Sequence, residues 1–113
     1  MNNEELYQKG MEAFAEDQYD KAIEFLLQAT QQDPTFSDAF QALAMAHYHR
    51  GDLDRSIQAA RRLTELQPDN ILAWTSLSMA YQQKGMISEA EAAGEKAKEL
   101  GLKETFRIKP KES

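Results

Sequence analysis

The segment Phe40–Ser56, FQALAMAHYHRGDLDRS, recurs 34 residues later as Trp74–Ala90, WTSLSMAYQQKGMISEA. Both segments begin with an aromatic residue, carry Leu at the fourth position and Gly at the twelfth, and share a Met between them. A fixed period of this length is typical of repeat proteins, in which each unit packs against its neighbours. Three units align without gaps at residues 3–36, 37–70 and 71–104, and a tail follows at 105–113.

Each unit is predicted to form two helices joined by a short turn. The larger apolar residues of segment 37–50 follow helical spacing, and Gly51 after Arg50 is a typical helix stop. Pro34 and Pro68 are predicted to close the second helices of the first two units. The residues expected to cap helix N-termini with their side chains are Asp20, Asp54, Ser88, Ser37 and Asn70.

The composition favours one all-α domain. Of the 113 residues, 42% are hydrophobic and only 5 are Gly and 3 are Pro, while good helix formers dominate. The chain has no Cys, which excludes disulfides, thiolate metal sites and a Cys nucleophile. The N-terminus lacks signal-peptide features and no apolar run is long enough for a membrane helix, so we expect a cytoplasmic protein without membrane insertion.

The three units resemble the tetratricopeptide repeat, and the resemblance covers residues 3–104. The third unit matches the family pattern best, through Trp74, Leu77, Ser78, Tyr81, Gly85, Ala90 and Ala97. In the first unit, Leu6, Lys9 and Ala13 are weaker matches. The resemblance implies a right-handed α-solenoid of six antiparallel helices in a single domain, 1–104, with no cofactor.

The stretch HYHRGD, His47–Asp52, has three interpretations. The two histidines resemble metal ligands, Arg50–Asp52 spells a cell-adhesion tripeptide, or the stretch is simply a helix end and its turn. His47 and His49 are two residues apart and face different sides of a helix, whereas a helical metal pair needs a spacing of three or four. Gly51 aligns with Gly85, so the turn explains the tripeptide, and we expect neither a metal site nor an adhesion role.

In proteins of the resembled family, the first helix of each repeat lines a concave face, where solenoids bind partners. Met11, Met45 and Met79 are 34 residues apart and would form a ladder across this groove. Methionine adapts its shape, so a floor of Met and aromatic residues suits an apolar or amphipathic peptide. Alternatively, these residues fill the core between helices. The predicted partner-binding residues are Tyr7, Met11, Phe14, Gln41, Met45, Tyr48, His49, Thr75, Met79 and Gln82.

Some members of the family clamp the C-terminal carboxylate of chaperones with basic and amide side chains on these helices. The corresponding positions here are Tyr7, Met11, Ala42, Leu72 and Ser76. None of them carries a positive charge, and Glu4 and Asp38 at the rim would repel an acidic peptide. We therefore expect no chaperone carboxylate clamp.

The second helix of the third unit is more polar than its equivalents. Ile57 becomes Glu91, Ala60 becomes Gly94 and Thr64 becomes Lys98, which predicts that the array ends here or that this helix face is simply solvated.

In the tail, Phe106 and Ile108 alternate with charged residues, which predicts a short extended segment. It would be inert, fold back on the third unit, or dock in the groove of another copy.

These observations favour a non-catalytic module that binds a peptide segment of another protein. The alternative is a self-assembling scaffold, a homo-oligomer formed through the solenoid ends or the tail. Segment 1–113 contains no Gly-rich phosphate loop and no nucleophile motif, which argues against an enzyme. The formal charge of −6 argues against nucleic acid as the main partner.

Overall fold

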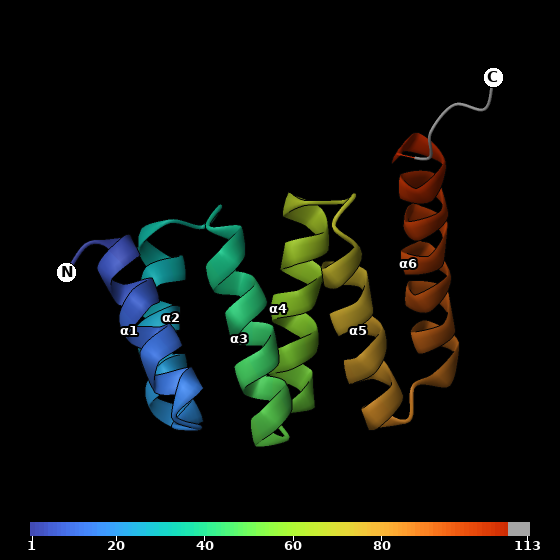
Figure 1. The fold of residues 1–113 in the computed structure, drawn as a ribbon. Coiled ribbons are helices and arrows are strands. Elements are labelled where there is room, and N and C mark those ends of the chain that lie inside the picture. The colour runs from blue at the N-terminus through green and yellow to red at the C-terminus, as the bar shows by residue number, and fades with distance from the viewer. Residues whose placement is uncertain (109–113) are drawn as a thin grey trace.

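The computed structural model describes the backbone of residues 1–108 and the side chains of residues 1–105. Within this part of the chain all regular structure is helical, which confirms the all-α class (Figure 1). The six helices are α1 (Asn3–Ala15), α2 (Tyr19–Gln32), α3 (Ser37–Arg50), α4 (Leu53–Leu66), α5 (Ile71–Lys84) and α6 (Ile87–Ile108).

The helices stack in chain order as antiparallel neighbours and build an elongated solenoid of three repeats. Each helix packs mainly against the helix before it and the helix after it, and the described chain measures 52 × 34 × 24 Å. The first helices of the repeats, α1, α3 and α5, line one side of the molecule in Figure 1. Contacts between α1 and α3 and between α3 and α5 join them across the repeats.

The predicted helix stops at glycine are confirmed. Gly51 and Gly85 follow α3 and α5 with φ of 82° and 85°, a left-handed conformation that glycine adopts without the steric cost of a Cβ. The backbone N–H of Gly51 donates to the Tyr48 carbonyl at 3.0 Å, and that of Asp52 donates to the His47 carbonyl at 2.9 Å. These bonds satisfy carbonyls that the helix end leaves without a partner.

Most predicted N-caps are wrong. Asn70 does cap α5, because its side chain accepts a hydrogen bond from the Leu72 N–H at 2.9 Å. Helices α2, α4 and α6 each begin one residue before the residue predicted to cap them, so these three residues lie inside the first turn. Ser37 is likewise the first residue of α3. The residues misplaced as caps are Asp20, Asp54, Ser88 and Ser37.

Two of these misplaced residues instead join successive repeats. Asp20 on α2 forms an ion pair with Arg50 at the end of α3. Asp54 on α4 forms the same pair with Lys84 at the end of α5. Both partners shift by 34 residues between the two junctions, so these pairs mark a repeated register between the second helix of one repeat and the first helix of the next.

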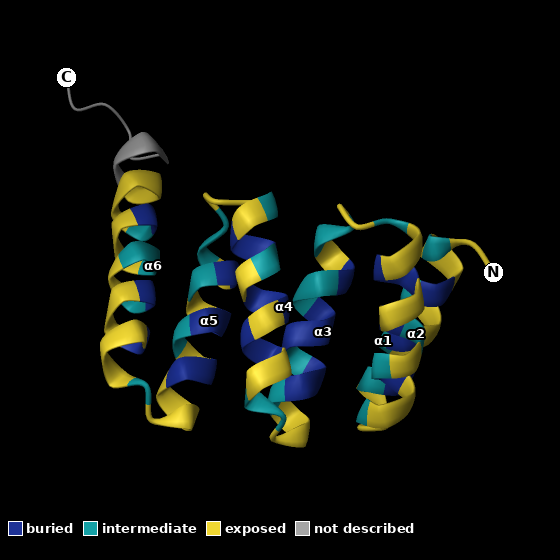
Figure 2. Ribbon diagram, turned by 180° about the vertical axis from the view of Figure 1, so that it is seen from behind, coloured by how far each residue is buried: buried dark blue, intermediate teal, exposed yellow. Residues whose placement is uncertain are grey.

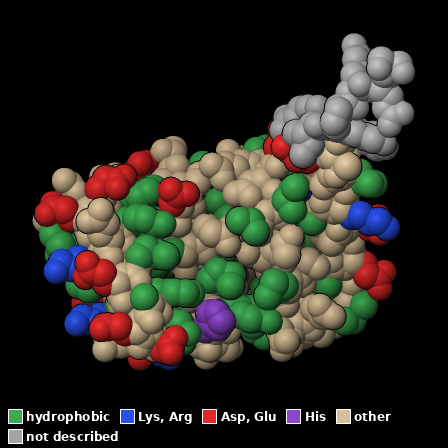
Figure 3. Space-filling view, viewed as in Figure 1, with side chains coloured by type: hydrophobic (Ala, Val, Ile, Leu, Met, Phe, Trp, Pro, Cys, Tyr) green, Lys and Arg blue, Asp and Glu red, His purple; other side chains and the backbone are tan. Residues whose placement is uncertain are grey.

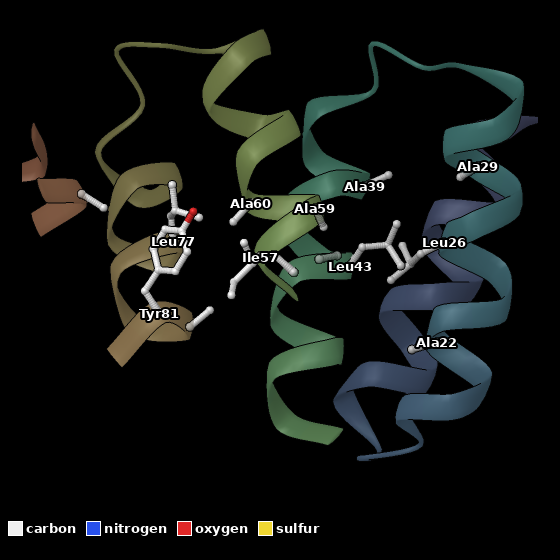
Figure 4. Packing of buried hydrophobic residues seen from close by; sticks show 14 of the residues in the cluster. Ala22, Leu26, Ala29, Ala39, Leu43, Ile57, Ala59, Ala60, Leu77 and Tyr81 are labelled. Carbon is white, nitrogen blue, oxygen red and sulfur yellow. The ribbon is translucent and has the colours of Figure 1, made fainter. Parts of the chain in front are cut away.

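Small residues form much of the core and let the helices approach closely. Ala22, Ala29, Ala44 and Ala60 are fully buried, and Leu26 fills the space between α1, α2 and α3 (Figure 4). The buried faces run along the sides on which neighbouring helices meet (Figure 2). A repeated hydrogen bond joins the helices of a pair: Ser56 Oγ donates to the Ala44 carbonyl at 2.8 Å, and Ser78 Oγ donates to the Ala90 carbonyl at 2.8 Å.

Helix α6 corrects the prediction for the C-terminus. It extends through Ile108, so the proposed boundary between 104 and 105 falls inside a helix and the extended segment is wrong up to this point. The hydroxyl of Thr105 donates to the Gly101 carbonyl at 2.9 Å, as in a continuing helix. The short alternation around Phe106 was too brief to distinguish a strand from a helix. The contacts predicted for Phe106 and Ile108 concern side chains outside the described residues.

None of the helices in residues 1–108 has the length and apolar character that a membrane span requires.

Replacing Gly10 by Ala should destabilise the fold by about 1–2 kcal/mol, even though Ala favours helices by about 1 kcal/mol. A Cβ at Gly10 would lie 2.7 Å from Cγ of the fully buried Leu26, and this leucine has little room to move. Gly101→Ala is the matched control, because a Cβ there meets open space. It should leave stability unchanged or raise it by up to about 1 kcal/mol. Urea unfolding followed by circular dichroism measures both, and equal effects would contradict the packing argument.

Candidate groove between the first helices

A hollow of about 300 Å³ lies between α1 and α3 on the face that the first helices form. Its residues are Tyr7, Met11, Phe14, Asp38, Gln41, Ala42, Met45 and His49. Six of the ten residues predicted for the groove therefore lie around one hollow. Figure 3 shows hydrophobic side chains gathered over the α1–α3 half of this face, with a histidine among them.

The 34-residue spacing positions the methionines of this hollow. Met11 on α1 and Met45 on α3 occupy equivalent positions and both are half-buried, and Met11 packs against the core. Met11 therefore contacts the core and the hollow at once, so the two interpretations of the Met ladder are not exclusive for this residue. Met79 on α5 is 36% exposed and lies outside the hollow.

A polar contact links the floor of the hollow to the third repeat. Gln41 Nε2 donates a hydrogen bond to the hydroxyl of Ser76 on α5 at 3.1 Å. Ser76 Oγ in turn lies 3.8 Å from the sulfur of Met45. The remaining polar atom of this amide, Gln41 Oε1, is buried and accepts no hydrogen bond from the described residues. Buried polar atoms normally have partners, and this oxygen is closed to solvent, so a ligand would reach it only after the amide turns toward the hollow.

Aromatic rings close one end of the hollow. His49 stacks on Tyr19 with ring centroids 5.2 Å apart, and Phe14 meets both rings edge-on. Tyr48 contacts His49 edge-on at 5.9 Å. The sequence analysis missed Tyr19, which is the first residue of α2. Its equivalents in the other repeats are Leu53 and Ile87, so no repeated aromatic residue pointed to this contact.

The other predicted groove residues lie elsewhere. Tyr48 is half-buried and reaches the hollow only through His49. Thr75 and Met79 are exposed on α5. Gln82 lines a separate hollow between α5 and α6. The third repeat therefore extends the face but does not contribute to the apolar hollow.

The rim of the hollow is acidic. Asp38 and Glu4 are exposed and lie near Tyr7. Burial, followed by the charges of Asp38 and Glu4, raises the pKa of the Tyr7 hydroxyl above its usual value. Both carboxylates therefore act on this end of the hollow, and their sign favours a ligand with a positive charge.

The histidines have separate structural environments. His49 is exposed in the hollow, whereas His47 is buried and faces another hollow between α2, α3 and α4. Within the described residues, no three His, Asp or Glu side chains gather as metal ligands would. In the tripeptide, Arg50 pairs with Asp20 and Gly51 ends α3, so both residues have roles in the fold.

Two family models described as tetratricopeptide repeat match the chain, at residues 13–79 and 71–100. Crystal structures of MamA are similar, one with 28% identity and a TM-score of 0.89 over 93% of this chain and 61% of that chain. The Sgt2 TPR domain from Aspergillus fumigatus has 26% identity and a TM-score of 0.82, over 88% of this chain and 66% of that one.

The first TPR of Spaghetti (RPAP3), bound to the HSP90 peptide SRMEEVD, has 20% identity and a TM-score of 0.84. It covers 88% of this chain and 79% of that chain, and at this identity the likeness shows the fold alone. No curated protein matches the chain. The chain spans 61% of the length of the first two MamA structures, so it corresponds to only part of them.

The buried His47 should make stability fall as the pH drops through about 6.5, the usual pKa of histidine in an unfolded chain. Burial lowers the pKa of His47 in the fold, and Arg55 adds to this, whereas Asp52 at 4.0 Å opposes it. Between the His47 pKa of the unfolded chain and the lower pKa of the folded chain, His47 is protonated in the unfolded chain and neutral in the folded one. Lowering the pH through this range therefore stabilises the unfolded chain. His47→Gln should reduce this loss of unfolding free energy in urea titrations, whereas His49→Gln should retain it. An unchanged slope in His47→Gln would contradict the assignment.

Proposed function

Because the chain belongs to the tetratricopeptide-repeat family, we propose that it is a non-catalytic module that binds an apolar or amphipathic peptide segment of another protein. The hollow between α1 and α3 carries this proposal. It combines half-buried Met and aromatic side chains with a polar atom that has no partner among the described residues. Such concave, mainly apolar sites with a few convergent polar groups are typical of ligand sites.

The floor of the hollow suits an apolar anchor. Met11 and Met45 have flexible, polarisable side chains that can adapt to different apolar groups. Phe14 and the exposed ring of His49 supply flat surfaces at one end. An aliphatic or aromatic side chain of the peptide would remove these surfaces from water.

The polar groups define the rest of the ligand. Gln41 Oε1 has no partner among the described residues, and once the amide turns toward the hollow it can accept a hydrogen bond from a backbone N–H of the peptide. Asp38 and Glu4 at the rim favour a Lys or Arg next to the apolar anchor. We therefore infer a peptide with a basic residue beside an apolar one.

An acidic chaperone tail does not fit this hollow. The RPAP3 structure contains the peptide SRMEEVD, in which acidic residues precede the C-terminal Val-Asp. Here the lining residues include Asp38 and contain no Lys or Arg. Like charges would oppose such a ligand, so the proposal excludes a carboxylate clamp.

The proposal also excludes catalysis at this site. Both histidines are explained by packing, since His47 is buried and His49 stacks on Tyr19. The tetratricopeptide-repeat family and the MamA and Sgt2 folds support an interaction module rather than an enzyme. A cytoplasmic location remains part of the proposal.

Met45→Glu should weaken peptide binding at least about tenfold, because it places a carboxylate against an apolar ligand in a partly dry hollow. Ligands are first selected from a random peptide library displayed on phage, with the unmodified chain as bait. Fluorescence anisotropy then measures the affinity of selected peptides for each variant.

Gln58→Glu is the matched control, because it introduces the same charge on the exposed face of α4. Met45 is half-buried, so thermal unfolding is measured in parallel, and Asp38→Lys provides a variant at an exposed position. Asp38→Lys should weaken binding of peptides that carry a basic residue. Equal binding by the unmodified chain, Met45→Glu and Asp38→Lys would show that the groove is not the site.

A further inference from the structure

The two ends of the solenoid are unlike in charge and shape. At the C-terminal end, a hollow of about 520 Å³ lies between α5 and α6, and within the described chain no helix packs on its outer side. We call this surface the C-terminal end face; its residues are Ser78, Gln82, Ile87, Ala90, Glu91, Gly94 and Glu95. The N-terminal end face is formed by α1 and α2 and includes Glu5, Lys9, Glu12, Ala13, Glu16 and Lys21.

The internal junctions show how two such faces fit together. The ion pair between Asp20 and Arg50 fixes the level of α2 against the antiparallel α3. Two helical turns from this pair, Leu27 of α2 lies level with Leu43 of α3, and both line the same hollow. Leu43 also points toward Leu26 on α2 (Figure 4). The pair between Asp54 and Lys84 repeats this register at the second junction.

The residues at these contact positions change at both ends of the chain. Leu43 and Leu77 align with Lys9, so the apolar contact residue of the first helix is replaced by a long, positively charged side chain. Leu26 and Ala60 align with Gly94. The second-helix position that faces Leu43 in the first junction therefore has no side chain in the third repeat. Two positions near this glycine become acidic. Ile57 aligns with Glu91, about one turn before Gly94, and Arg61 aligns with Glu95, directly after it.

We propose that the C-terminal end face binds the N-terminal end face of a second copy of this chain, in the register of the internal junctions. Lys9 of the second copy then lies over Gly94, where the hollow leaves room for its side chain. Its ammonium pairs with Glu91 and Glu95, both of which are exposed in the single chain. One turn further on, Lys98 of the first copy lies level with Leu6 of the second, beside Glu5.

The order of the charges supports a second copy as the occupant. Charged ends that only prevent stacking would carry like charges at the central level position, whereas Glu95 lies level with Lys9 there; Glu99 and Glu5, which are also level, oppose the contact. At the position of the internal ion pairs, Ser88 of the first copy meets Glu16 of the second, a contact without repulsion between like charges. Glu12 and the net charge of −6 oppose the contact, so we expect a weak association that depends on concentration.

This contact is heterologous, because each copy uses two different surfaces. Every added copy presents a new free end, so the association generates a series of oligomers rather than a closed dimer. The groove between α1 and α3 lies on another face, so each copy in the series retains its own peptide site.

Sedimentation velocity over about a hundredfold range of concentration tests the proposal. The unmodified chain should form oligomers as the concentration rises. Lys9→Glu and Glu95→Lys each place like charges at the contact, so each variant alone should associate about tenfold more weakly or not at all. An equimolar mixture of the two should associate again. The altered N-terminal end face of one variant and the altered C-terminal end face of the other carry opposite charges, and the two unaltered faces also match.

Restoration in the mixture is the decisive result, since a loss of folding in either variant cannot produce it. A monomer at all concentrations for the unmodified chain would overturn the proposal. So would association that persists in both single variants, or a mixture that behaves like its components. Met45→Glu should associate as the unmodified chain does, and Lys9→Glu should bind selected peptides normally, which separates this proposal from the groove.

Discussion

The close approach of neighbouring helices is the constraint on which the rest of the structure depends. A Cβ on Gly10 would lie 2.7 Å from Cγ of Leu26. The Ala44 carbonyl accepts a hydrogen bond from the Ser56 hydroxyl across the α3–α4 pair. These small residues set the distance between helices, and the distance sets the angle at which repeats stack. The groove between α1 and α3 exists because this stacking leaves the first helices side by side without closing the space between them.

Periodicity predicted the fold well because the same physical problem is solved three times in one chain. Gly51 and Gly85 identified the turns, and the 34-residue register placed Met11 and Met45 on one face. The helix starts were less predictable. Asp20 and Asp54 have the chemistry of caps, but the same carboxylates gain an ion pair with the next repeat, and only a three-dimensional arrangement distinguishes these uses.

The candidate groove was predicted in part for a related reason. The 34-residue register predicts where along the face a residue lies. How deeply its side chain is buried depends on the helices that surround it. Met79 and Thr75 occupy groove positions of the third repeat, but no following first helix in the described chain encloses them, so they remain exposed. Tyr19 joins the hollow through stacking on His49, a contact between helices that a pattern within one repeat does not reveal.

Gln41 has a consequence for communication along the solenoid. Its amide faces two ways: Nε2 is held by Ser76 of the third repeat, while Oε1 points to no described partner. On the proposed function, a peptide that bonds to Oε1 would restrict the rotation of this side chain and strengthen its link to α5. By thermodynamic reciprocity, anything that steadies the third repeat then favours the ligand. On the proposed function, this one glutamine would couple occupancy of the groove in the first two repeats to the position of α5 in the third.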